Sequence, residues 1–141
     1  MPSCYLLDTS ILSTLIQDPQ GAATKRLAQL DAEAACTSIV VACELRYGAA
    51  KRGSAVLTQR VEELLGSIDV MPFDGDADRQ YAEIRAGLER VGKTVDGNDL
   101  LIAAHARALD LILVTHNLGE FERVPGLQLE DWLDPTLATR K

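Results

Sequence analysis

The sequence has few aromatic residues, few cysteines and no long apolar segment. Aromatic side chains make up 4% of its 141 residues, and the cysteines are Cys4, Cys36 and Cys43. No apolar run approaches the ~20 residues of a membrane helix, so no membrane association is expected. No cysteine belongs to a C-x-x-C pair or lies near a histidine at zinc-ligand spacing. Buried thiols in a reducing compartment, the cytoplasm, are the simplest interpretation.

An export signal is also lacking, since no basic region precedes the first apolar residues and Asp8 interrupts them. An excess of positive charge is lacking too: the net charge is −7, whereas proteins that bind nucleic acids are usually basic. A nucleic-acid enzyme could still have this charge if its acids gather in a pocket that a metal neutralises. The charge would equally suit a chain whose usual partner is a basic protein.

Hydrophobic residues make up 47% of the chain, enough for one domain with a real core over residues 1–141. Short apolar runs alternate with helical patterns. Strands are expected at 4–7, 35–38, 68–71, 111–115 and 127–129. Helices are expected at 11–16, 21–33, 39–50, 55–66, 76–91 and 99–109, with Thr9 or Ser10 capping the first and Asn98 the last. Alternation of this kind predicts an α/β fold with a parallel sheet covered on both faces.

Several acids fall where such a sheet would place a ligand. Asp8 directly follows the first strand, at the carboxyl end where open parallel sheets bind ligands. Thr115-His116-Asn117 should arrive at the same end. Asp99 opens the helix before that strand, and Glu44 lies in the otherwise apolar stretch SIVVACELRYG.

Each acid has a structural alternative. Asp8 could cap a helix, Asp99 could favour a helix dipole, and Glu44 could form a buried salt bridge with an arginine. Three converging carboxylates would, however, raise one another's pKa values unless a cation lies between them. Mg²⁺ prefers such oxygen ligands and keeps waters for substrate phosphates, which suits hydrolysis of a phosphodiester.

Four segments carry a family resemblance: YLLDTSIL, SIVVACELRYGA, GNDLLIAAHARAL and LILVTHNLGEFERVPGLQLEDW. Together and in this order they resemble the PIN-domain ribonucleases, in particular the VapC-like toxins of bacterial toxin–antitoxin modules, from residue 5 to about 132. The resemblance implies a three-layer α/β/α fold with a short parallel sheet. It also implies an acidic pocket that binds Mg²⁺ or Mn²⁺ and cuts single-stranded RNA.

On the family pattern, Asp8 and Asp99 would be the principal metal ligands. Glu44 would complete the cluster, directly or through a water. Ser10 and Thr115 match positions beside the site that often carry small polar residues.

The sequence departs from the pattern at two positions. Many members have a fourth acid where Asn117 stands, and an amide adds no charge, so a second metal should bind weakly or only with RNA present. Asp96 stands where related toxins commonly have glycine; it could restore local charge or be a solvated loop acid. We expect His105 to be a surface or packing residue that points away from Asp99, and His116 to be an exposed turn residue or an RNA contact.

The resemblance also implies partners. These are an RNA substrate, a cognate small antitoxin and a second copy of the chain in a homodimer. The tail VTHNLGEFERVPGL resembles the branch that cuts the anticodon stem-loop of transfer RNA, with initiator tRNA as first candidate. Arg46 and Arg52 could hold RNA phosphates or merely be solvated.

A catalytically weak PIN-like module that binds RNA or protein is the main alternative, and Asn117 is the reason to consider it. A receiver-like phosphoacceptor fits less well. The first strand ends in the single acid Asp8, and V-T-H-N stands where that class has a lysine.

Overall fold

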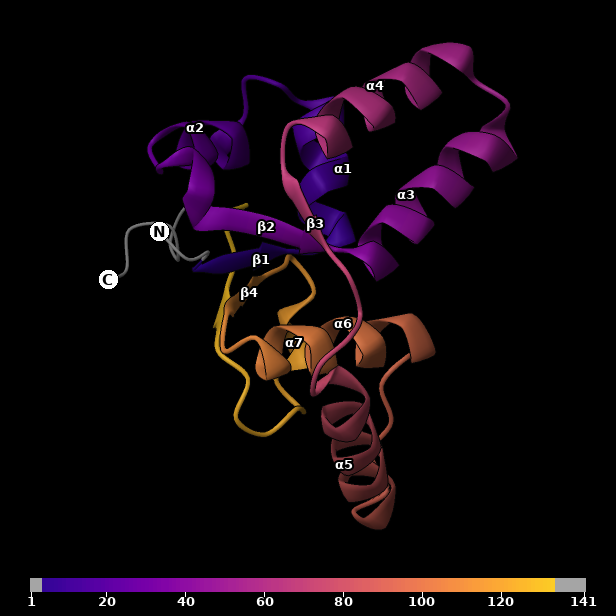
Figure 1. Ribbon diagram of the computed structural model, residues 1–141, viewed down its shortest axis with the longest axis vertical. Coiled ribbons are helices and arrows are strands. Elements are labelled where there is room, and N and C mark those ends of the chain that lie inside the picture. Colours follow the sequence, from indigo (N-terminus) through magenta and orange to yellow (C-terminus); the bar gives the residue numbers. More distant parts are fainter. Residues whose placement is uncertain (1–3, 134–141) are drawn as a thin grey trace.

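A parallel five-stranded sheet forms the centre of the computed structural model, which describes residues 4–133 (Figure 1). The strand order is β3-β2-β1-β4-β5, and each neighbouring pair is parallel. The strands are β1 (Tyr5–Leu7), β2 (Ala35–Ser38), β3 (Asp69–Met71), β4 (Ile112–Val114) and β5 (Leu129–Glu130). The predicted domain limits at residues 1 and 141 lie outside the described residues.

Helices cover both faces of this sheet. The first group lies on one side and comprises α1 (Thr9–Gln17), α2 (Ala22–Ala28), α3 (Ile39–Arg52) and α4 (Ala55–Gly66). The second group lies on the other side and comprises α5 (Ala77–Arg90), α6 (Gly97–Ala108) and α7 (Leu118–Phe121). The predicted three-layer α/β/α fold is therefore confirmed. Within residues 4–133, no helix is both long and apolar enough to cross a membrane.

Burial on both faces explains why the strand sequences are continuously apolar. In β1, the central strand, Leu6 and Leu7 are fully buried, as are Leu113 and Val114 in the adjacent β4. A strand with only one buried face would instead alternate apolar and polar residues. Because β1 and β4 are neighbours, the residues that follow them emerge side by side at the carboxyl edge.

Three local expectations were wrong. Asp8, rather than Thr9 or Ser10, is the N-cap of α1, because its carboxylate accepts the Thr9 N–H. The helix predicted over 21–33 is α2 followed by a separate 3₁₀ turn, Ala32–Ala34, because the extended backbone of Asp31 redirects the chain toward β2.

Asn98 is not the cap of α6 either: this helix begins at Gly97, two residues before the predicted start, with Asp96 as its N-cap. The amide of Asn98 instead donates a hydrogen bond to Glu44. The short helix α7 was not predicted.

A buried polar contact ties α6 to the start of α3. His105 is 1% exposed, and its Nδ1 lies 2.7 Å from the hydroxyl of Ser38, the N-cap of α3. Since that hydroxyl accepts the Val40 N–H, its own hydrogen is available to donate to Nδ1. Burial lowers the pKa of His105, an effect that the carbonyl of Pro72 and the charge of Asp74 oppose. His105 is thus the packing residue that was expected.

This contact predicts a pH-dependent stability. Above pH ~6.5 neither the folded nor the unfolded His105 is protonated. Below that value the unfolded chain takes up a proton that the folded chain does not, so the free energy of unfolding should fall until the pH reaches the lowered pKa of the folded state. Urea unfolding from about pH 8 to about pH 5.5 should show a steeper loss for the wild type than for His105→Gln. Parallel curves for the two proteins would contradict the prediction.

A candidate active site at the carboxyl edge of the sheet

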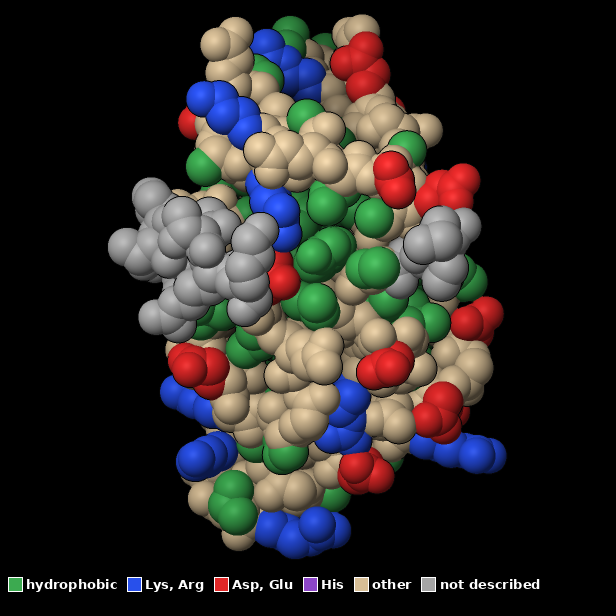
Figure 2. Space-filling model, turned by 90° about the vertical axis from the view of Figure 1, so that its left-hand side faces the viewer, with side chains coloured by type: hydrophobic (Ala, Val, Ile, Leu, Met, Phe, Trp, Pro, Cys, Tyr) green, Lys and Arg blue, Asp and Glu red, His purple; other side chains and the backbone are tan. Residues whose placement is uncertain are grey.

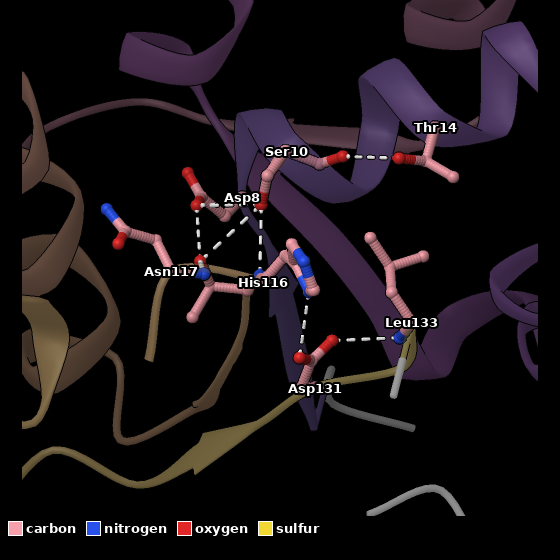
Figure 3. Close-up of polar contacts among 8 residues, drawn as sticks. Asp8, Ser10, Thr14, His116, Asn117, Asp131 and Leu133 are labelled. Carbon is pink, nitrogen blue, oxygen red and sulfur yellow. Dashed lines mark hydrogen bonds and ion pairs between the residues drawn. The ribbon is translucent and has the colours of Figure 1, made fainter. Parts of the chain in front are cut away.

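Asp8 is held at the carboxyl end of β1 by three hydrogen bonds. Its Oδ1 accepts the Thr9 N–H at 2.6 Å, and its Oδ2 accepts the hydroxyls of Thr115 at 2.6 Å and Ser10 at 3.2 Å (Figure 3). The side chain is only 4% exposed, and this burial raises the pKa of Asp8 above its ordinary value. The three donors lower the pKa and oppose the effect of burial only in part. All of them are neutral, so they fix the carboxylate without cancelling its charge.

Glu44 extends from α3 to the same edge and is half-buried. Its Oε1 accepts a short hydrogen bond from the hydroxyl of Thr9, and its Oε2 accepts one from the amide of Asn98 at 3.2 Å. Neither partner carries a charge, so Glu44 forms no salt bridge with an arginine among residues 4–133, contrary to the alternative considered for it. Thr9 connects the two acids: its backbone holds Asp8 and its side chain holds Glu44.

Asp99 lies in the first turn of α6 and faces a further acid, Glu120 of α7. The pKa of Asp99 is raised to about 8, first by burial and then by a hydrogen bond with the Glu120 carboxyl. The negative charges of Asp8, Glu120 and Glu44 add to this effect. Because this pKa lies above neutral pH, Asp99 keeps its proton at pH 7 and can donate it to Glu120, and the four acids form one electrostatic group.

No arginine or lysine in the described part of the chain pairs with this group. Among residues 4–133, the ion pairs of the protein involve other carboxylates, such as Glu62 with Arg46 and Glu83 with Arg107. Nor do any three acidic, histidine or cysteine side chains in the described part of the chain meet closely enough to cage an ion by themselves. The acids instead hold neutral hydrogen-bond donors and a shared proton. Oxygen ligands with uncompensated charge are the donor set that hard divalent cations prefer, so these residues fit such a cation.

The other residues predicted from the sequence, Asn117, Asp96 and Arg46, make separate contacts. Asn117 directly follows the strand end, where its backbone N–H donates to the Thr115 hydroxyl at 3.0 Å; its amide extends to the opposite side from His116 (Figure 3). Asp96 is exposed, and its backbone N–H donates to Glu120. Arg46 of α3 forms an ion pair with Glu62 of α4: its Nε and Nη2 each lie 2.9 Å from the Glu62 carboxylate.

Arg52 lines a groove that begins at the site. This groove has a volume of about 400 Å³ and lies between α1, α3 and α4. Thr9 and Glu44 line it at the site, together with apolar residues of the three helices, and Arg60 is a second arginine in its wall.

Two functional candidates were missed in the sequence. Glu120 stands within the segment VTHNLGEF that carries the resemblance, so its position in a motif was the available signal. Asp131 is 5% exposed and accepts a hydrogen bond from the ring of His116 at 2.9 Å, a contact that no local pattern predicts.

Comparisons with known proteins agree with this architecture. Residues 5–127 match the PIN domain family. The chain is 40% identical to the tRNA(fMet)-specific endonuclease VapC of Shigella flexneri, over 91% of this chain and 97% of that protein. It is 37% identical to the ribonuclease VapC2 of Haemophilus influenzae, over 92% of this chain and 98% of that protein.

Solved structures show the same fold. The VapBC2 complex of Rickettsia felis, bound to a DNA fragment from its promoter, contains a chain with a TM-score of 0.84 and 34% identity; the alignment covers 92% of this chain and 98% of that one. The DNA-bound VapBC of Salmonella typhimurium gives the same values. The fold, the acids at the carboxyl edge and these similarities lead to one assignment: the chain belongs to the PIN-domain family and, within it, to the VapC ribonucleases.

Proposed function

We propose that this chain is the toxin of a toxin–antitoxin pair and that it hydrolyses RNA with the help of Mg²⁺ or Mn²⁺. The observation that carries the proposal is the group formed by Asp8, Glu44, Asp99 and Glu120. These carboxylates come from four separate elements and are paired with no arginine or lysine among residues 4–133. Burial, the hydrogen bond with Glu120 and the charges of the other acids together raise the pKa of Asp99 to about 8. A group whose like charges cost stability is retained where a cation is to be bound.

Asp8 and Asp99 would hold the metal directly, and Glu44 would do so directly or through a water. When bound, the metal would polarise the scissile phosphoryl group and lower the pKa of the attacking water. Binding would also displace the proton that Asp99 shares with Glu120, because the ligands must be ionised. The single amide of Asn117 adds no charge, so the site is better suited to one tightly held ion than to two.

The protein's own residues fix the geometry of the reaction. Thr115, Ser10 and the Thr9 N–H leave Asp8 a single orientation, and Thr9 couples that orientation to Glu44. Such preorganisation is the usual source of electrostatic catalysis, since nothing needs to reorient as charge develops. No side-chain nucleophile is required, because water would attack the phosphorus. The 3′-oxygen would leave, so one product would carry a 5′-phosphate.

The activity itself provides the first test. Asp8→Asn and Asp99→Asn should each reduce the metal-dependent cleavage of single-stranded RNA at least about 100-fold, because each removes a carboxylate that would hold the metal. Asp69→Asn is the matched control, since Asp69 is an exposed acid on β3. Cleavage by either site variant at the wild-type rate would contradict the assignment of the site, and no metal-dependent cleavage by the wild type would favour the alternative of a catalytically weak PIN-like binding module.

Metal binding can be measured without any RNA. Mn²⁺ at about 100 times its dissociation constant should stabilise the wild type by about 2.7 kcal/mol, because the ion binds only the folded chain. The rise in melting temperature should disappear in Asp99→Asn and persist in Asp69→Asn. An equal rise in all three proteins would place the ion elsewhere.

We take initiator transfer RNA as the substrate to examine first, specifically its anticodon stem-loop. Support comes from the 40% identity to the tRNA(fMet)-specific endonuclease VapC of Shigella flexneri. Sequencing the 5′ ends of cellular RNA after induction of the toxin identifies the target directly and requires no prior choice of substrate.

The groove beside Glu44 is the proposed seat of an antitoxin segment. Its wall combines apolar helix faces with Glu44, in the first half of α3, and Arg52, the last residue of that helix, about 12 Å further along it. An amphipathic segment with a basic residue at the Glu44 end and an acidic residue near Arg52 would complement it. The VapBC structures are complexes of relatives, which supports a partner of this kind.

Filling the groove should separate inhibition from catalysis. Ala49 is 3% exposed in the groove wall, and Ala49→Trp should weaken inhibition by the product of the neighbouring small gene at least about tenfold while RNA cleavage persists. The control is Ala82→Trp, an exposed position on α5. Full inhibition of a folded Ala49→Trp protein would exclude this groove as the antitoxin seat.

We also propose that the chain forms a homodimer in the cytoplasm. The face on which β1 and β2 begin carries apolar side chains near its centre (Figure 2). That face is opposite the acid group, so a second copy docked there would leave the site open to RNA.

A further inference from the structure

His116 is fixed beside the acid group by two separate contacts. Its backbone N–H donates to the Ser10 hydroxyl at 3.1 Å, and that same hydroxyl donates to Asp8 at 3.2 Å. Its ring Nδ1 lies 2.9 Å from Oδ2 of Asp131, which lies just beyond β5 (Figure 3). The ring is thus held at the rim of the site, although 60% of the side chain is exposed.

Asp131 is itself held firmly. Its side chain is 4% exposed, and its second oxygen, Oδ1, accepts the Leu133 N–H at 2.8 Å. A carboxylate can only accept, so the hydrogen of the neutral imidazole must be on Nδ1. The other ring nitrogen, Nε2, is then a hydrogen-bond acceptor with no partner in the described part of the chain.

An exposed acceptor next to a negatively charged group is poorly suited to a phosphate, which offers only acceptors at neutral pH. It is well suited to a hydroxyl donor. RNA carries such a donor on every ribose, and the 2′-hydroxyl lies next to the phosphate of the same nucleotide. His116 is linked to Asp8 through the Ser10 hydroxyl, so a strand whose phosphate is bound at the acid group through a metal has a ribose hydroxyl beside the His116 ring.

We infer that Nε2 of His116 accepts a hydrogen bond from the 2′-hydroxyl of a substrate ribose, with Asp131 as the residue that positions the ring. His116 is then a specificity residue that favours RNA over DNA, and it takes no part in breaking the phosphodiester bond. This inference rests on the endoribonuclease activity proposed above.

The test pairs a change in the protein with a change in the substrate. An RNA oligonucleotide that the wild type cleaves is prepared with a single 2′-deoxy nucleotide at each position around the cleaved bond. Because the proposed nucleophile is water, the substitution leaves the chemistry intact. In the wild type, kcat/KM should fall three- to tenfold at one position, the value of one hydrogen bond of about 1 kcal/mol. In His116→Ala the penalty at that position should disappear.

Two further variants complete the design. Gln128→Ala, an exposed change just before β5, should keep the full penalty. Asp131→Asn can present its amide N–H to Nδ1 and so move the ring hydrogen to Nε2. A 2′-fluoro ribose, which can only accept, should then be tolerated better by this variant than by the wild type.

Each outcome bears on the inference. If His116→Ala lowers the cleavage of RNA and of the 2′-deoxy substrates by the same factor, His116 is only a structural link between β4 and β5 and the inference is wrong. An unchanged penalty in a folded His116→Ala protein also overturns it. Should the wild type cleave no RNA, the proposed function fails separately. In that case, fluorescence anisotropy with RNA and DNA of one sequence tests the role of His116. The wild type should bind RNA more tightly than DNA, and His116→Ala should bind the two equally.

Discussion

Mutual repulsion among Asp8, Glu44, Asp99 and Glu120 is the constraint around which this protein is organised. Four carboxylates from four elements lie along one edge of the sheet, and burial together with the charges of the other three raises the pKa of Asp99 to about 8. Such a group lowers the stability of the fold in the absence of a cation. The fold tolerates it because the buried strands and the helices on both faces supply the stabilisation that the site itself does not.

The sheet explains how residues so distant in sequence can meet. β1 and β4 are parallel neighbours at its centre, so Asp8 and Thr115 leave the sheet together and form a 2.6 Å hydrogen bond. The same arrangement brings Ser10 against the backbone of His116. The hydrogen bond between His105 and Ser38 joins α6 to the start of α3, and these two helices carry Asp99 and Glu44. The pairing of the buried strands and these hydrogen bonds between elements therefore fix the positions of the acids.

Much of this could be predicted from the sequence, because the signals were local. A continuous apolar run followed by an acid placed Asp8 at a strand end, and an acid within an apolar helix face identified Glu44 as a residue in need of explanation. Contacts between residues that are distant in the sequence and are brought together only by the fold gave no such signal. The pairing of His116 with Asp131 depends on β5 lying beside β4, and that of Asp99 with Glu120 depends on a four-residue helix too short to have a periodicity.

The partners of each acid distinguish this group from the ordinary ion pairs of the surface. Elsewhere in residues 4–133, carboxylates meet arginines, as Glu62 meets Arg46 and Glu89 meets Arg85. At the carboxyl edge the donors are hydroxyls, an amide and a backbone N–H, which fix direction but leave the charge intact. An arginine would have stabilised the fold and filled the place of the cation. Because neutral donors stand there instead, the charge remains available to a metal and, through it, to a phosphate that the acids alone would repel.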